Sequence, residues 1–151
     1  MRTGLATLQV LDHYRLGERS AQIGEDLRVR LRSAHSGYEM VEEIRGTGLL
    51  SGIVFAPPQR LKLRVAFETS RKIHSAMFGQ VLVMRMFRDH GFLTQVCGND
   101  FMVLKVAPPL VVTNEQIDAF VSAIHQVVDL AHSSNIFWSE ALGLARRAID
   151  I

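Results

Sequence analysis

Residues 41–58 read Val-Glu-Glu-Ile-Arg-Gly-Thr-Gly-Leu-Leu-Ser-Gly-Ile-Val-Phe-Ala-Pro-Pro and carry the clearest structural signal in the chain. Two runs with apolar residues suited to strands flank the Gly-Thr-Gly of residues 46–48. Two such runs around a glycine-containing turn are typical of a β-hairpin. The prolines at 57–58 end the second run, because proline cannot donate a hydrogen bond to a neighbouring strand. The sequence therefore predicts a hairpin over residues 38–57.

The chain before this hairpin has helical periodicity over residues 1–35. Ile23, Leu27 and Leu31 follow one another at i, i+4 and i+8, so they share one face of a helix. Leucines nearer the start form an earlier stripe, and Gly17 after Leu16 offers a break between the two. We therefore predict an interrupted helical segment that ends before the hairpin.

The segment after the hairpin, residues 59–75, is open to more than one interpretation. Apolar residues occupy every second position from 61 to 67, which is strand periodicity. An ordered loop or a short helix is equally compatible with this segment. Residues 76–90 are apolar nearly all round and predict a helix buried on several sides. Gly91 is placed to end that helix in a left-handed conformation.

The last third of the chain predicts strands followed by helices. Two strands are expected within residues 92–107, joined by a turn whose residues tolerate positive φ. Their predicted bounds are Phe92–Val96 and Phe101–Val106. Helices are expected over residues 114–149, where Thr113 and Gln116 have the spacing of a capping box. The last of these helices is predicted from roughly Trp138 to Ile149.

This order of elements favours an α+β fold in which helices cover a small, mainly antiparallel sheet of about three to four strands. The chain has 151 residues, of which 48% are hydrophobic and 21% charged, so we expect a single domain over residues 1–151. It contains no apolar run of about 18 residues and begins without the pattern of a signal peptide. Because one cysteine cannot form an internal disulfide, we expect a cytoplasmic protein.

The charge pattern does not indicate nucleic-acid binding. Lys and Arg total 17 and Asp and Glu total 15, for a formal net charge of +2. Nucleic-acid binders usually gather their cations on one face. The densest run here is Arg28, Arg30 and Arg32, which point to different sides of the predicted helix. We interpret them as a solvated face rather than a phosphate patch.

Most residue types that carry chemistry lie in contexts that favour structural roles. The glycines at 46, 48 and 52 miss the dinucleotide-binding spacing and precede a strand rather than a helix, so they predict turn geometry. The six histidines lack metal-ligand spacing, and surface or capping roles are expected for them. Cys97 has no nucleophile signature and is expected to be a small buried side chain. We therefore predict no metal site and no catalytic residue within this chain.

Lys105 differs from these, because it lies within the otherwise apolar run Phe-Met-Val-Leu-Lys-Val-Ala of residues 101–107. A charged group in such a strand must be paired or must reach water with its end. Two interpretations follow. Lys105 is either an edge lysine that extends past the sheet, or a cation directed into a cleft toward a carboxylate or another anion.

Three runs of the sequence together resemble the C-terminal small domain of class III, ornithine-aminotransferase-like, pyridoxal-phosphate-dependent aminotransferases. They are Arg-Gly-Thr-Gly-Leu-Leu-Ser-Gly-Ile-Val-Phe at 45–55, Leu-Lys-Val-Ala-Pro-Pro-Leu at 104–110 with Thr-Asn-Glu-Gln-Ile-Asp at 113–118, and Ala-Thr-Leu-Gln-Val-Leu at 6–11. The runs occur in the family's order. The resemblance implies the small-domain fold of fold-type I pyridoxal-phosphate enzymes, which agrees with the α+β prediction.

The resemblance also implies what the complete enzyme would do. It would transfer an amino group between an amine or amino acid and an oxo acid or aldehyde, with pyridoxal phosphate held by a lysine in a separate large domain. Lys62, Lys72 and Lys105 lie in no setting that resembles that lysine's motif. The chain alone is therefore expected to bind no cofactor and to be inactive. The large domain of the same polypeptide, and further copies in a homo-oligomer, are its expected partners.

In family members that use α-amino acids, an arginine in the strand before the Pro-Pro-Leu motif typically binds the substrate carboxylate. In this sequence Lys105 occupies the place of that arginine. The resemblance therefore implies that Lys105 binds substrate. Lysine offers a point charge where arginine offers a planar fork, so a diamine or other ω-amine donor is conceivable. The alternative is a stand-alone, non-catalytic interaction or dimerisation domain that kept the fold.

Overall fold

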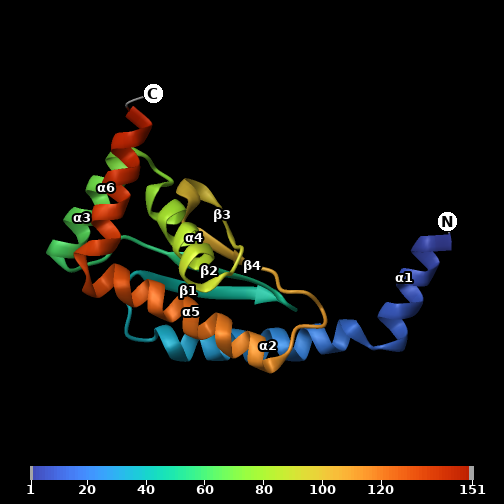
Figure 1. The fold of residues 1–151 in the computed structure, drawn as a ribbon. Helices are drawn as coiled ribbons and strands as arrows, with labels where there is room; N and C mark the ends of the chain where they lie inside the picture. Colours follow the sequence, from blue (N-terminus) through green and yellow to red (C-terminus); the bar gives the residue numbers. More distant parts are fainter. Residues whose placement is uncertain (1, 150–151) are drawn as a thin grey trace.

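The computed structural model describes the backbone of residues 2–149 and the side chains of residues 3–99 and 101–144. Residues 1 and 150–151, at the ends of the domain predicted from the sequence, lie outside the described residues. Figure 1 shows the arrangement of the elements. In chain order they are α1 (Arg2–His13), α2 (Leu16–His35), β1 (Val41–Thr47), β2 (Leu50–Phe55), α3 (Leu61–Ile73), α4 (Met77–His90), β3 (Gln95–Cys97), the 3-10 helix η1 (Asn99–Phe101), β4 (Val103–Val106), α5 (Asn114–Ser133) and α6 (Asn135–Ile149).

The strands form one four-stranded sheet in the order β1-β2-β4-β3, and every neighbouring pair is antiparallel. This confirms the α+β prediction and the predicted β1–β2 hairpin. β1 and β3 lie at the edges, whereas β2 and β4 are paired on both sides. No helix among residues 2–149 is long and apolar enough to cross a membrane.

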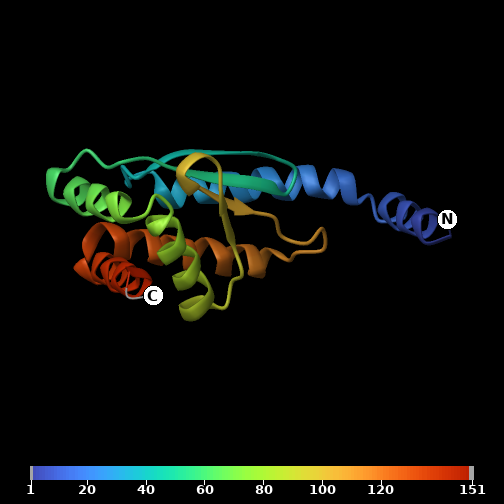
Figure 2. The ribbon, with the colours of Figure 1, turned by 90° about the horizontal axis from the view of Figure 1, so that it is seen from above.

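The helices that cover the sheet lie on one of its faces. Figure 2 shows α4 and α5 on the same side of the strands. Ile44, Ile53 and Leu104 point into the core with at most 8% of their surface exposed. Their neighbours Arg45 and Lys105 are exposed on the opposite face, because successive side chains of a strand alternate between faces. We call that second face the open face of the sheet.

The turn between β1 and β2 sits directly on α2. A Cβ at Gly24 would lie 1.8 Å from the carbonyl oxygen of Gly48, so only glycine fits at this position of the helix. Gly48 itself has a φ of +51°, the left-handed region that favours glycine. The Ser20 hydroxyl accepts a hydrogen bond from the Leu49 amide at 3.0 Å, and the Arg28 guanidinium donates to the Gly48 carbonyl at 2.7 Å.

The prediction of a solvated arginine face on α2 is wrong for Arg28, whereas Arg32 is exposed and Arg30 is partly exposed. Arg28 is only 6% exposed, because its guanidinium bridges the Gly48 carbonyl and the Glu25 carboxylate. Arg32 donates to the Ile44 carbonyl at 3.1 Å, and Arg30 pairs with Asp118 of α5. Side-chain length lets these three residues reach the hairpin and α5 from different sides of one helix. Their hydrogen bonds and ion pairs connect α2 to the hairpin and to α5.

The strand periodicity of residues 61–67 is also overturned, because this segment belongs to the helix α3. Its buried residues Leu63, Phe67 and Ser70 recur at helical spacing, while Leu61 is 77% exposed and Val65 is 57% exposed. The alternation arose because apolar residues occupy both the buried and the solvent side of α3. The short-helix alternative is the one that the structure confirms.

Four other boundaries differ from the predictions. The first break in the helical segment falls at Arg15, which is in the left-handed region with a φ of 48°, and α2 begins at Leu16. β3 begins at Gln95 rather than Phe92, since Phe92 packs instead against Phe120 of α5 with ring centroids 5.4 Å apart. η1 precedes β4, which therefore starts two residues later than expected, and α6 starts at Asn135 rather than Trp138.

Replacing Gly24 by alanine should destabilise the fold by at least about 2 kcal/mol, because its Cβ would overlap the Gly48 carbonyl and the turn would have to move. Gly17→Ala in the same helix is the matched control. A Cβ there meets nothing within 4 Å, so this change should be neutral or slightly stabilising. Urea unfolding followed by circular dichroism measures both, and equal stabilities would contradict the proposed contact.

Candidate functional site

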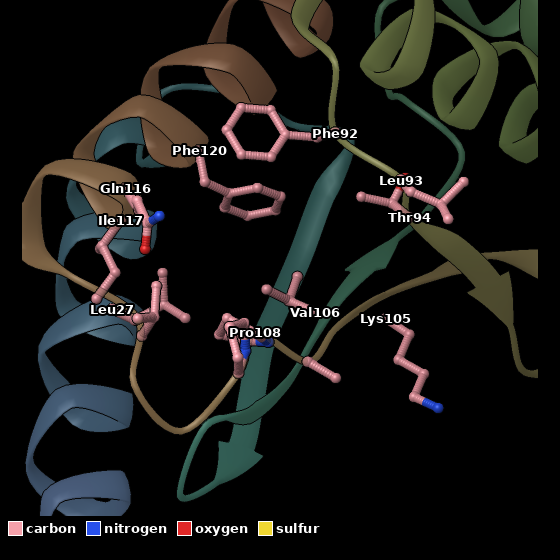
Figure 3. A pocket seen from close by; sticks show the side chains of 13 residues that line it. Leu27, Phe92, Leu93, Thr94, Lys105, Val106, Pro108, Gln116, Ile117 and Phe120 are labelled. Atoms are coloured by element: carbon pink, nitrogen blue, oxygen red, sulfur yellow. The ribbon is translucent and has the colours of Figure 1, made fainter.

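An apolar cavity of about 320 Å³ lies beyond the end of β4, between the sheet, α2 and α5 (Figure 3). α2 contributes Leu27, and α5 contributes Ile117 and Phe120. The remaining lining residues are Phe92, Leu93, Thr94, residues 105–109, Val112 and Gln116. The cavity is therefore lined by parts of the chain that lie more than 90 residues apart in the sequence.

The wall formed by the β4–α5 connection is held in place from both ends. Pro108 and Pro109 follow β4 and stop it, because proline has no amide hydrogen for a strand partner. The Arg19 guanidinium donates to the Leu110 carbonyl at 3.1 Å and to the Val112 carbonyl at 2.6 Å. Since both acceptors belong to the connection, α2 fixes its course around the cavity.

The N-terminus of α5 closes the cavity with a capping box, as the sequence predicts. The Thr113 hydroxyl accepts from the Gln116 amide at 3.3 Å, and the Gln116 side chain accepts from the Thr113 amide at 3.0 Å. Thr94 has a buried hydroxyl without a hydrogen-bond partner among the described residues. With Gln116 engaged in the cap, the cavity offers mainly apolar contact and holds no group suited to catalysis.

Lys105 lies at the rim of this cavity but points away from it. Figure 3 shows its side chain directed away from the rings of Phe92 and Phe120. β4 is an inner strand, so Lys105 does not lie at an edge of the sheet, although its end does reach solvent. The other interpretation, a cation directed into a cleft, is not met at this cavity. Lys105 pairs in register with Gly52 on β2 and with Gln95 on β3, and it is exposed on the open face. The ammonium group is therefore available to an anion that approaches this face.

The other candidates have structural positions. Gly48 adopts the predicted turn conformation, whereas Gly46 and Gly52, for which turn geometry was also predicted, lie within β1 and β2. Cys97 is half-buried on the open face, opposite Val103, rather than fully buried. Among the described residues, no group of three or more histidine, cysteine or acidic side chains could hold a metal ion.

Sequence reasoning missed a cluster of three histidines around Tyr38. His125 and His132 lie seven residues apart on α5 and therefore share a face, and this spacing was the available signal. Their ring centroids lie 5.4 and 4.8 Å from that of Tyr38, and His35 of α2 lies 5.8 Å from His125. The Tyr38 hydroxyl donates to the Asp129 carboxylate at 2.9 Å. The cluster joins the ends of α2 and α5.

Each histidine of this cluster has Nδ1 against a backbone carbonyl, at 2.8 Å from Leu31 for His35 and at 3.1 Å from Val128 for His132. A carbonyl can only accept, so Nδ1 carries the hydrogen and Nε2 is the bare nitrogen of a neutral ring. Nε2 of both residues is buried without a partner in the described part of the chain. Burial lowers the pKa of His35 and of His132, and for His132 it outweighs the opposing effect of the nearby Glu39 and Asp129 carboxylates.

The chain belongs to the class-III aminotransferase family, whose family model matches residues 1–128. Among its curated relatives, the acetylornithine aminotransferase of Mycolicibacterium smegmatis is 31% identical over 128 residues, which cover 85% of this chain and 27% of that protein. The diaminobutyrate–2-oxoglutarate aminotransferase of Rhizobium meliloti is 29% identical over 124 residues, which cover 82% of this chain and 25% of that protein.

Solved structures of the family share this fold. A phospholyase from Arthrobacter in complex with phosphoethanolamine superposes with a TM-score of 0.68 at 28% identity, covering 83% of this chain and 27% of the phospholyase. The chain thus spans about a quarter of the length of the relatives that it matches. The similarity to this family, implied by three short runs of sequence, extends over most of the chain.

The described residues do not by themselves fit pyridoxal phosphate. Attachment of this cofactor requires a lysine that reaches a pocket, with an acidic partner for the pyridine nitrogen. Lys62 and Lys72 are exposed on α3, and Lys105 directs its ammonium away from the cavity. The cavity lining contains no carboxylate. No step of a cofactor reaction can therefore be derived from this chain.

The free energy of unfolding should decrease as the pH falls from about 7.5 to about 5.5. Because the pKa values of buried His35 and His132 lie below their ordinary 6.5, the unfolded chain binds more protons than the folded chain in this range. The contribution is complete above the unfolded pKa and is lost as the pH falls through 6.5 toward the folded pKa. Urea unfolding at several pH values measures the slope.

His35→Gln removes one titrating ring and should flatten this pH dependence, whatever its effect on stability at neutral pH. His13→Gln on exposed α1 is the control and should leave the slope unchanged. A His35→Gln slope equal to that of the unaltered chain would show that the cluster does not couple folding to protonation.

Proposed function

We propose that this chain is the C-terminal small domain, over residues 1–151, of a pyridoxal-phosphate-dependent aminotransferase, and that Lys105 binds an anionic group of its substrate. The reaction would transfer an amino group between an amine or amino acid and an oxo acid or aldehyde. One observation carries the proposal for Lys105: an exposed ammonium lies on an inner strand, three residues before a Pro-Pro motif, in a chain of this family. Family membership supports pyridoxal phosphate as the cofactor of the complete enzyme.

The groups that hold the cofactor would come from the remainder of a longer polypeptide. The relatives are about four times as long as the matched segment, and the described residues lack a suitable lysine pocket. α1 extends away from the sheet (Figure 1), and its Leu5 and Leu8 are 60% and 64% exposed. Such apolar surface supports packing against the remaining domain or against a second copy in a cytoplasmic homo-oligomer.

The substrate class follows from the chemistry of Lys105. An ammonium offers point-charge attraction and up to three hydrogen bonds, without the planar geometry by which arginine binds a carboxylate in two places. Two relatives are named for their substrates, one for acetylornithine and one for diaminobutyrate with 2-oxoglutarate. A third, the phospholyase, has a structure in complex with phosphoethanolamine. These names support an amino donor with a second functional group and leave ω-amines and diamines within the proposed range.

The alternative of a stand-alone interaction domain draws on the exposed stripe of α1. In both proposals another domain or another protein covers this apolar surface. They differ in whether the gene encodes a further domain upstream of residue 1. An upstream reading frame of roughly 250–300 residues with a cofactor-binding lysine would support the enzyme, in keeping with usual domain sizes. A natural start near the present first residue would support the interaction domain.

In the complete enzyme, Lys105→Ala should raise KM for the anion-bearing substrate by about fivefold to tenfold, the size of one exposed charged contact. Steady-state kinetics over a range of substrate concentrations measures it, and Lys105→Arg should preserve most of the affinity. Unchanged kinetics for every substrate tested would remove Lys105 from the site.

The 151-residue chain alone should show no transaminase turnover and no absorbance band of bound pyridoxal phosphate. The reason is that Lys105, the lysine at the apolar cavity, directs its ammonium away from it, and that the cavity lining contains no carboxylate. Absorbance spectroscopy after incubation with the cofactor and removal of the excess tests this directly. A stable cofactor band together with turnover would overturn the assignment of the chemistry to a separate domain.

A further inference from the structure

The open face of the sheet carries a row of residues that crosses all four strands. The pairing register aligns Arg45 of β1 with Gly52 of β2, Gly52 with Lys105 of β4, and Lys105 with Gln95 of β3. Residues directly opposite each other on antiparallel strands point to the same face. Arg45, Lys105 and Gln95 therefore extend from one face, in one line, with Gly52 between the two cations.

Gly52 leaves a gap in this row. Neighbouring strands lie about 4.8 Å apart, so the backbones of Arg45 and Lys105 are separated by roughly 10 Å. The residue between them is glycine, so it contributes no side chain to this space. A Cβ at Gly52 would lie 3.1 Å from a methyl group of Val103, which bounds the gap on one side. Two long cationic side chains can thus reach one group placed above Gly52.

Neither cation is committed to a strong partner. Arg45 contacts the Glu43 carboxylate at 3.3 Å, and both side chains are at least half exposed. Exposed pairs of this kind contribute at most about 1 kcal/mol. The ammonium group of Lys105 has no hydrogen bond or ion pair among the described residues. The row contains two cations and an amide, and with the one Glu43 carboxylate beside Arg45 included its local charge is still positive.

We infer that Arg45 is a second substrate-binding cation, and that Arg45 and Lys105 together hold one oxyanion above Gly52, with the Gln95 amide beside it. This inference rests on the proposed role of Lys105. Arg45 supplies the planar, two-pronged donor that Lys105 lacks, while Lys105 supplies a compact charge on the other side of the gap. The oxyanion is a carboxylate or a phosphate group of a small molecule.

The test measures the affinity of the complete enzyme for 2-oxoglutarate and, separately, for O-phosphoethanolamine by isothermal titration calorimetry. Arg45→Ala should weaken binding of one of these probes by about threefold to fivefold, the size expected for an exposed charge pair. The probe that responds identifies the oxyanion as carboxylate or phosphate. Arg64→Ala on α3, an exposed position outside the sheet, makes the same change in net charge and should alter neither affinity by more than about twofold.

The Gly52→Ala variant tests the gap between the two cations without changing the charge of the protein. Its Cβ enters the gap, so it should weaken the same probe, while thermal unfolding checks that the fold persists. If Lys105→Ala weakens binding and both Arg45→Ala and Gly52→Ala do not, the inference fails and the role of Lys105 stands. If none of the three variants changes either affinity, the role of Lys105 fails as well. Equal losses in Arg45→Ala and Arg64→Ala would assign the effect to net charge and overturn the inference.

Discussion

The contact between α2 and the β1–β2 turn is the constraint on which the sheet depends. Gly24 leaves room for the Gly48 carbonyl, and Arg28 donates a hydrogen bond to that same oxygen. This contact fixes where the hairpin lies along α2. A shift of one residue in a strand would exchange its two faces, so the turn also decides that Ile53 is buried and Gly52 lies on the open face.

The candidate site follows from that register through β4. β4 adds to β2 with Leu104 opposite Ile53, and both are fully buried in the core. Lys105 must then face outward beside Gly52. The same strand ends at two prolines, and the connection that follows is held by Arg19 around an apolar cavity. One short strand thereby separates a charged surface from an apolar pocket, which suits a domain that forms one wall of a larger site.

Features that depend on residues close together in the sequence were predicted correctly, whereas features that depend on distant residues were missed. The hairpin, the capping box at Thr113 and the left-handed Gly91 at the end of α4 were predicted, since each depends on residues within a few positions. α3 was ambiguous, because apolar residues on its solvent side imitate strand periodicity. The burial of Arg28 was missed, because its partners lie on a hairpin some 20 residues away.

The sequence by itself determined most of the local elements, the α+β class and the position of Lys105 as the one charged residue of an apolar strand. Only the tertiary structure decided that β4 is an inner strand and that Arg45, Gly52 and Lys105 stand in one row. The tertiary structure also places His35 of α2 next to His125 of α5. Residues far apart in the chain become neighbours through the packing of a shared core, and the spacing of amino acids along a sequence does not contain that choice.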